Sequence, residues 1–158
     1  MVSPEERLKK LGIDLPGMPS PLGAYVPSVR SGNLLFLSGM LPLRKGKLSR
    51  TGRVGAEVSV GDAQEDARQA VINALSIVRA EIGSLGKVVK CVKVVGFVAS
   101  ATDFIQQPAV LNAASELLLA VFGDRGKHTR VAVGVPVLPL NSPLEIEFIF
   151  EVTEKEPA

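Results

Sequence analysis

The chain has 158 residues, 46% of them hydrophobic and only 4% aromatic, which predicts one domain with a core of mainly aliphatic side chains. Its 18 basic and 16 acidic residues leave a net charge of +2, so nucleic acid is not an expected partner. A single cysteine excludes an internal disulfide framework. No run of residues has the length and apolar character of a signal peptide or a membrane span, so we expect a cytoplasmic protein without a membrane partner.

The first predicted element is a short helix that begins at Ser3. Serine can cap a helix, the proline after it suits the first turn, and the two glutamates that follow are favoured at the positive helix end. Gly12 should end this helix, and a segment rich in proline and glycine follows. We expect a single domain over residues 1–158, made of an N-terminal extension at 1–20 and a core at 21–152.

A β-hairpin is predicted next. Strands are expected at Tyr25–Arg30 and Leu34–Ser38, and the Ser-Gly-Asn sequence between them is typical of a turn. Gly39 breaks the strand pattern. The polar, glycine-punctuated residues 44–55 predict a surface loop or a short hairpin.

Two long helices alternate with the remaining strands. Ser59 and Asp62 resemble a capping box, and apolar residues then recur at helical spacing as far as Ile82. The later elements are a strand with a bulge or an exposed start, a second long helix, and two closing strands. Their predicted ranges are 88–99, 108–121, 129–135 and 144–151.

This order of elements predicts an α+β fold, a mixed β-sheet with two long helices packed on one face. The other face would carry apolar or small side chains and would need a cover, so we expect it to pack against other subunits. The side chains assigned to that face are Leu35, Leu37, Val92, Val94, Ala132 and Ile149.

Arg130 is the last charged residue before a long uncharged run that ends at Glu145. Strand alternation places Arg130 on one face with Ala132 and Gly134, which are the smallest neighbours available. A guanidinium beside a shallow hollow suits a small carboxylate. We expect the two closing strands to be neighbours, so that Arg130 and Glu145 share one place. The alternative is a structural ion pair between Arg130 and a glutamate on the next strand, with Glu145 an ordinary surface residue.

Five segments carry a more specific signal. They are PLGAYVPSVRSGNLLFLSG, DARQAVINALSIV, VVKCVKVVGFVASATDF, LNAASELLLAVFG, and TRVAVGV followed by LEIEFIFEV. In this order and spacing, from Pro21 to Val152, they resemble the Rid or YjgF-type family of reactive-intermediate imine deaminases. The resemblance implies a chorismate-mutase-like α+β domain that forms homotrimers, with the sheets inside and the active sites in clefts between subunits.

The resemblance also implies roles for single residues. Arg130 would bind the substrate carboxylate, and Glu145 would orient or activate water. Four further residues would bind the substrate or line its site, namely Tyr25, Ser38, Gly39 and Asn112. Met40 stands where the family commonly has glutamine, and Val131–Ala132 where it often has serine and cysteine, so we expect a more apolar pocket.

The implied reaction is hydrolysis of a 2-imino acid or its enamine tautomer, such as 2-aminoacrylate, to a 2-keto acid and ammonia, without a metal or an organic cofactor. The alternative is a trimer that binds a small keto acid or amino acid without turnover. A third possibility is RNA binding or cleavage, or chaperone-like activity, which are attributed to some family members. The weak charge and the scarce aromatic residues disfavour RNA recognition.

Taken without the resemblance, several of these residues have ordinary structural roles. Tyr25 would pack and make one hydrogen bond, Ser38 would end a strand, and Asn112 would cap or brace its helix. The only histidine, His128, is expected in an exposed loop without a metal or nucleophile partner set. Cys91 alternates with valines and is expected to be inert in the core.

Overall fold

The computed structural model describes residues 2–18 and 23–153. The predicted boundary between extension and core, at residues 20 and 21, lies outside these ranges. Three α-helices and seven strands are found in the described part of the chain. The helices are α1 (Pro4–Lys10), α2 (Val60–Ile82) and α3 (Gln107–Phe122), and the strands are β1 (Ser28–Ser31), β2 (Leu34–Leu37), β3 (Leu43–Arg44), β4 (Lys47–Leu48), β5 (Val88–Ala99), β6 (Thr129–Val135) and β7 (Leu144–Val152).

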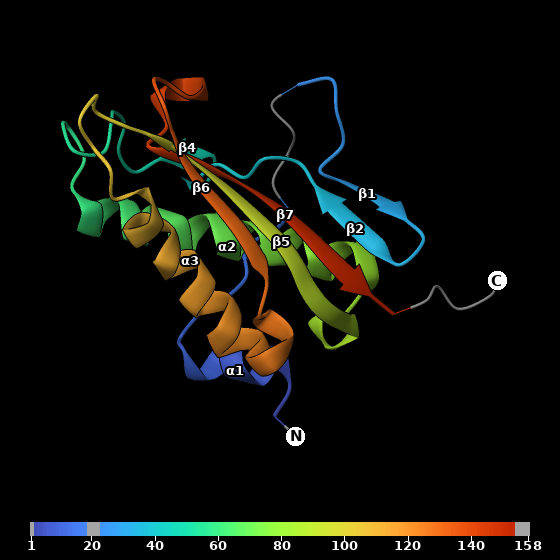
Figure 1. Ribbon diagram of the computed structural model, residues 1–158. Helices are drawn as coiled ribbons and strands as arrows, with labels where there is room; N and C mark the ends of the chain where they lie inside the picture. Colours follow the sequence, from blue (N-terminus) through green and yellow to red (C-terminus); the bar gives the residue numbers. More distant parts are fainter. Residues whose placement is uncertain (1, 19–22, 154–158) are drawn as a thin grey trace.

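Five of the strands form one mixed sheet in the order β1-β2-β7-β5-β6, and α2 and α3 pack against it (Figure 1). Only the β5–β6 pair is parallel, because α3 connects these two strands in a crossover. The α+β fold with a mixed sheet is therefore confirmed. The prediction that the two closing strands are neighbours is wrong, since β5 pairs with β6 on one side and with β7 on the other.

The predicted elements are found with small changes at their ends. Register shifts interrupt the pairing of β5 with β7 near Val88 and Cys91, which confirms the expected bulge. The first hairpin strand begins at Ser28 rather than Tyr25, and residues 44–55 contribute to the short β3–β4 hairpin. Helix α2 begins where the Ser59 side chain accepts a hydrogen bond from Asp62 N at 3.1 Å.

The sheet buries the face that the sequence analysis had assigned to the outside. Leu35, Leu37 and Val94 are 0%, 4% and 0% exposed and belong to the core beneath the helices. Alternation separates the two faces of a strand but does not say which one the helices cover, and here the assignment was reversed for these three residues. Ala132 also lies on the helix side, half-buried against the core, and Val92 and Ile149 are half-buried.

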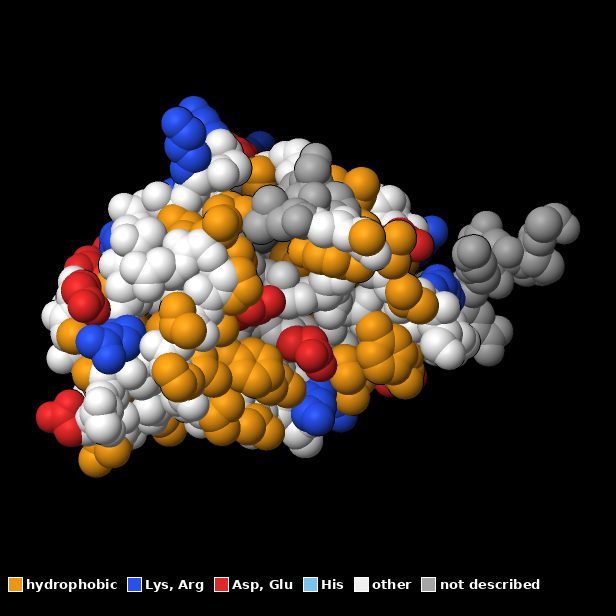
Figure 2. Space-filling view, turned by 90° about the horizontal axis from the view of Figure 1, so that it is seen from above, with side chains coloured by type: hydrophobic (Ala, Val, Ile, Leu, Met, Phe, Trp, Pro, Cys, Tyr) orange, Lys and Arg blue, Asp and Glu red, His pale blue; other side chains and the backbone are white. Residues whose placement is uncertain are grey.

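Several apolar side chains are exposed instead, on β2 and β6 among other places. Those on these two strands are Leu34, Phe36, Val131 and Val133. Figure 2 shows one side of the molecule, where hydrophobic side chains form a broad area with acidic side chains in the hollow between them. Such an area exceeds the single exposed apolar residues that are usual on a monomer.

Helix α1 braces the ends of the two long helices. Glu5 Oε1 accepts hydrogen bonds from Ser84 Oγ at 2.9 Å and from Leu85 N at 2.6 Å, at the turn that follows α2. Leu8 is buried in the core, and α1 also packs against α3 (Figure 1). The N-terminal extension is therefore an integral part of the packing.

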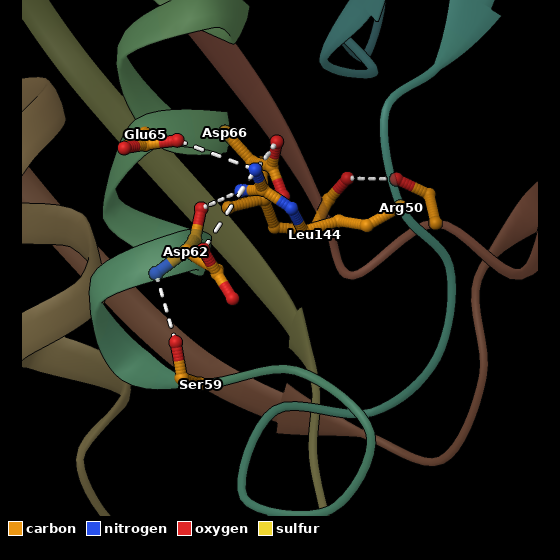
Figure 3. Close-up of polar contacts among 7 residues, drawn as sticks. Arg50, Ser59, Asp62, Glu65, Asp66 and Leu144 are labelled. Carbon is orange, nitrogen blue, oxygen red and sulfur yellow. Dashed lines mark hydrogen bonds and ion pairs between the residues drawn. The ribbon is translucent and has the colours of Figure 1, made fainter.

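A row of polar side chains on α2 holds the irregular backbone that follows β2. Asn73 Nδ2 donates to Leu41 O at 3.0 Å and to Leu43 O at 2.9 Å. About two turns earlier on the helix, Asp66 and its acidic neighbours hold Arg50 (Figure 3). These contacts fix the path of the chain from Leu41 to Arg50, on both sides of the β3–β4 hairpin. No helix in the described ranges combines the length and apolarity that crossing a bilayer requires.

Candidate functional site

Arg130 lies on the edge strand β6, on the face of the sheet that the helices cover. In register it pairs with Val94, which is buried. Its Nη1 atom donates to Asn112 Oδ1 at 2.9 Å and to Ser115 Oγ at 3.1 Å, both on α3. Within residues 2–18 and 23–153 no carboxylate lies at ion-pair distance from its guanidinium, so the structural ion pair considered above is not formed there.

The contacts of Arg130 leave one edge of its guanidinium available. Nη1 carries two protons, and the two α3 acceptors use both. Nε and Nη2 contact no acceptor in the described part of the chain. This pair of nitrogens forms the fork that binds a carboxylate through two parallel hydrogen bonds. The charge is therefore held by neutral groups and is not cancelled by an acid.

The hollow beside Arg130 extends over fewer residues of β6 than the sequence predicts. A Cβ placed on Gly134 would lie 2.8 Å from Gln107 Nε2 and 3.1 Å from Ser100 Oγ, so these side chains fill the space that the glycine leaves. Only the stretch of β6 near Ala132 keeps the small side chains that the alternation predicted.

His128 and Ser115 belong to the same cluster and were missed by the sequence analysis. Ser115 Oγ lies 2.9 Å from His128 Nε2, and His128 Nδ1 lies 2.6 Å from Gly126 O. His128 lies in the loop before β6, but it is half-buried and both of its ring nitrogens are hydrogen-bonded, so the expectation of an exposed position is wrong. A signal was available, because His128 stands directly before β6 and two residues from Arg130, a spacing that brings two side chains to the same side of an extended chain. We call Asn112, Ser115, His128 and Arg130 the α3-edge cluster.

Glu145 lies on β7 and points to the opposite face of the sheet. Its register partner is Phe97, whereas Phe148, three residues along, is buried and pairs with Val94 on the helix side. Burial raises the pKa of the Glu145 carboxyl above its usual value of 4.5. No hydrogen-bond donor or cation contacts it among the residues that the structure describes. A half-buried carboxyl with a raised pKa can exchange a proton nearer neutral pH.

Gly39 lies directly beneath that carboxyl. A Cβ at Gly39 would overlap Glu145 Oε1, so only glycine allows the glutamate to lie across this backbone. The adjacent Met40 exchanges two backbone hydrogen bonds with Ile146, at 2.8 and 3.0 Å, which keeps the segment alongside β7. Of the predicted residues, Gly39 and Glu145 are thus brought together.

Ser38 and Tyr25 lie near the start of the hairpin. The Ser38 hydroxyl donates to Val26 O at 2.6 Å and its N–H to Pro27 O at 2.9 Å, so within one chain this serine holds the backbone before β1. Tyr25 is 50% exposed.

The predicted residues therefore form two groups in one chain. Arg130 and Asn112 lie at the α3 edge, and Glu145 and Gly39 lie on the other face of the sheet. The expectation that neighbouring strands bring Arg130 and Glu145 to one place within a chain is not met. The reason is that β5 intervenes, and the register points the two side chains in opposite directions.

A cavity of about 340 Å³ lies between the loops at 51–57 and 136–141, and no predicted site residue lines it. In the described ranges, no three His, Cys, Asp or Glu side chains are grouped so that they could hold a metal ion. The chemistry that the residues offer is therefore that of a cation with an open fork and of a carboxyl with a raised pKa.

Comparison with known proteins gives consistent matches over nearly the whole chain. Residues 5–152 match the family described as "YjgF/chorismate mutase-like, putative endoribonuclease". The chain is 39% identical over 146 residues to protein TCP17 of Trypanosoma cruzi, a match that covers 92% of this chain and 91% of the relative. It is 34% identical over 137 residues to a protein of Dermatophagoides farinae named 2-iminobutanoate/2-iminopropanoate deaminase, covering 87% of this chain and 92% of the relative. The crystal structure of Atu1372 from Agrobacterium tumefaciens, a protein of unknown function, is similar with a TM-score of 0.89 and 44% identity, over 95% of this chain and 92% of that chain.

Proposed function

Because this chain belongs to the YjgF/chorismate-mutase-like family, we propose that it hydrolyses 2-imino acids, or their enamine tautomers, to 2-keto acids and ammonia. The relative from Dermatophagoides farinae is named as a deaminase of this kind. The observation that carries the proposal is the guanidinium of Arg130, whose Nε–Nη2 fork has no acceptor in the described chain while neutral groups hold Nη1.

Arg130 is proposed to bind the substrate carboxylate. Two parallel charge-assisted hydrogen bonds from Nε and Nη2 would fix the position of the adjacent imine carbon. Orientation of this kind is a large part of the catalysis that such a reactive substrate needs, because imines already react with water unaided. Asn112 shares the role, since its Oδ1 accepts from Nη1 and thereby holds the guanidinium.

Glu145 is proposed to move the proton. Its carboxylate takes a proton from water as the water oxygen bonds to the imine carbon and the C=N π electrons pass to nitrogen. The carboxyl then returns a proton to that nitrogen. Glu145 then takes the remaining hydroxyl proton and transfers it to the amino nitrogen, so that the C=O bond forms as the C–N bond breaks and ammonia leaves. Gly39 leaves room for Glu145, and Tyr25 and Ser38 are proposed to line the site.

The site is proposed to lie between copies of the chain in a homotrimer. Arg130 and Glu145 leave opposite faces of one sheet, so one chain does not direct both at a single substrate. The exposed apolar side chains on β2 and β6 support contacts between copies. The sheets would face inward, and residues 1–158 would act as one domain in each copy.

The test is an assay for pyruvate release. 2-Aminoacrylate is generated in place by a pyridoxal-phosphate-dependent dehydratase acting on serine, and the rate is compared with and without the protein. Acceleration is the expected result. Tight pyruvate binding in calorimetry without any acceleration would support the alternative, a trimer that binds small carboxylates.

Glu145→Gln supplies a second test, in which the raised pKa of Glu145 determines the direction in which kcat/KM changes with pH. The general base must be ionised, so kcat/KM should rise with pH through a pKa above the ordinary 4.5 of glutamic acid. Glu145→Gln should lower kcat about 10²- to 10⁴-fold and remove that limb of the profile. Glu147→Gln, on the same strand face but exposed, is the matched control and should keep both. An unchanged acidic limb in Glu145→Gln would remove Glu145 from the mechanism.

A further inference from the structure

In each hydrogen bond that supports Arg130, the chemistry of the atoms determines which group donates and which accepts. Gly126 O can only accept, so His128 Nδ1 donates to it at 2.6 Å. The neutral imidazole then has no proton on Nε2, and the Ser115 hydroxyl donates to that nitrogen at 2.9 Å. Ser115 Oγ keeps its lone pairs for Arg130 Nη1, which lies at 3.1 Å.

This order of donors holds the plane of the guanidinium. Ser115 and Asn112 are three residues apart on α3, so they lie side by side on one face of that helix. Each accepts one of the two Nη1 protons, and a planar guanidinium bound at both cannot turn without losing one bond. Nε and Nη2 are then presented at the edge away from these two acceptors.

Both supporting groups are uncharged, which matters for binding. An aspartate at position 115 would also accept from Arg130 but would neutralise its charge. Serine supplies the acceptor without the charge, and His128 supplies the acceptor that keeps the serine proton away from Arg130. The arrangement therefore combines a fixed orientation with a full positive charge for an incoming anion.

We infer that Ser115 and His128 are positioning residues that aim Arg130 at the carboxylate of the substrate and thereby set the affinity for it. The inference rests on one part of the proposed function, namely that Arg130 binds the carboxylate of the substrate. Neither residue touches the substrate. A nucleophilic role for the Ser115–His128 pair is disfavoured, because Ser115 lies inside α3, where the backbone N–H groups are bonded within the helix and offer no oxyanion site.

The experiment compares Ser115→Ala and Ser115→Thr in two measurements, the Kd of pyruvate by calorimetry and the split of KM and kcat in the pyruvate-release assay. Loss of one hydrogen bond to a charged group should weaken pyruvate binding and raise KM about 10- to 100-fold, with kcat nearly unchanged. Ser115→Thr keeps the hydroxyl and should restore both values to within about threefold of the wild type. His128→Gln retains an acceptor for Ser115 and should lie closer to the wild type than His128→Ala.

Glu116→Gln is the matched control, at the next residue of α3. The Glu116 side chain is exposed, and its ion pair with Arg68 is long, at 3.8 Å, and also exposed. It should leave Kd and KM unchanged. The Tm of each variant shows whether a weaker binding of pyruvate comes from lost positioning of Arg130 or from a less stable fold. Ser115→Thr should have the Tm of the wild type.

The outcomes separate this inference from the proposed function. If the wild type accelerates deamination but Ser115→Ala keeps the wild-type Kd and KM, the inference is overturned while the function stands. If the wild type binds pyruvate without turnover and Ser115→Ala weakens that binding, the function fails and the inference stands. A wild type that does not bind pyruvate, or a Ser115→Ala loss confined to kcat, also overturns the inference.

Discussion

Arg50 and Arg130 are both partly buried, and they differ in the groups that bind them. The guanidinium of Arg50 lies 3.2 Å from Glu65, 3.4 Å from Asp66 and 3.8 Å from Asp62, so three acids surround one cation (Figure 3). The guanidinium of Arg130 is held by an amide, a hydroxyl and no acid among the described residues. The first arginine joins the loop after β4 to α2, whereas the second keeps its charge available.

The comparison shows how the role of a buried arginine follows from the charge of its partners. An acid partner compensates the cost of burying the guanidinium and leaves little attraction for a further anion. Neutral acceptors satisfy the hydrogen-bonding geometry but leave the charge uncompensated, and an anionic ligand can then complete the site. Substitutions at the two arginines should therefore affect different properties.

The largest effect is expected at Arg130. Arg130→Ala removes two charge-assisted hydrogen bonds to the substrate, each worth about 1.5–3 kcal/mol, so kcat/KM should fall about 10²- to 10⁴-fold in the pyruvate-release assay. The free energy of unfolding should change little, because no acid is left uncompensated. A variant with full activity would show that the carboxylate binds elsewhere.

Arg50→Ala should show the reverse pattern. It leaves the buried carboxyl of Asp66 without its nearest cation, but a carboxyl with a pKa of about 6 can take up a proton, so the loss at pH 7 should be about 1–2 kcal/mol. Denaturant unfolding at pH 7 measures this loss, while the Kd of pyruvate should stay at the wild-type value. Because protonated Asp66 needs no cation, the loss should shrink at pH 5, and a loss independent of pH would contradict this account.

Asp66, which binds Arg50, should make the free energy of unfolding depend on pH. Burial raises its pKa from 3.8 to about 6 although Arg50 lowers it, and its Oδ2 atom has no hydrogen-bond partner among the described residues. The folded state thus holds the proton that the unfolded chain loses near pH 4, so this group costs stability as pH rises from about 4 to about 6. The cost approaches about 3 kcal/mol at neutral pH.

Asp66→Asn should remove that slope. The difference in unfolding free energy between this variant and the wild type, measured from pH 4 to pH 7, should move in favour of the variant as the pH rises. Titration of other groups is common to both proteins and cancels in the difference. A difference that stays constant over this range would show that Asp66 titrates normally.

The smallest effect is expected at Glu65, the acid nearest to Arg50. Its side chain is 65% exposed, and exposed ion pairs contribute about 0–1 kcal/mol. Glu65→Gln should therefore change the unfolding free energy by less than about 1 kcal/mol, and added salt should reduce the change further. A larger loss would mean that the three acids act as one network around Arg50.

Much of the fold could be predicted from local signals in the sequence. Ser59 and Gly83 bound the first long helix, and the Ser-Gly-Asn turn joins the first two strands, because caps and turns depend on neighbouring residues only. The side of the sheet that receives the helices depends on packing between distant segments. For that reason Leu35 and Val94 were assigned to the wrong face.

The candidate site shows the same limit. Arg130 and Glu145 were identified from the charge pattern and then by resemblance, but their opposite orientation follows from the placement of β5 between their strands, which no local pattern encodes. Ser115 and His128 were missed because they are thirteen residues apart in sequence and meet only when α3 packs beside β6. Contacts of this kind become visible once the crossover connection is known.

The close approach of Gly39 to Glu145 makes the tolerated substitutions at these two positions depend on each other. In the conformation that Glu145 adopts, any side chain larger than hydrogen at position 39 collides with its carboxyl. A shorter residue at 145 would remove this collision. The residues tolerated at the two positions are therefore coupled, since a larger residue at 39 requires Glu145 to change or to move its side chain.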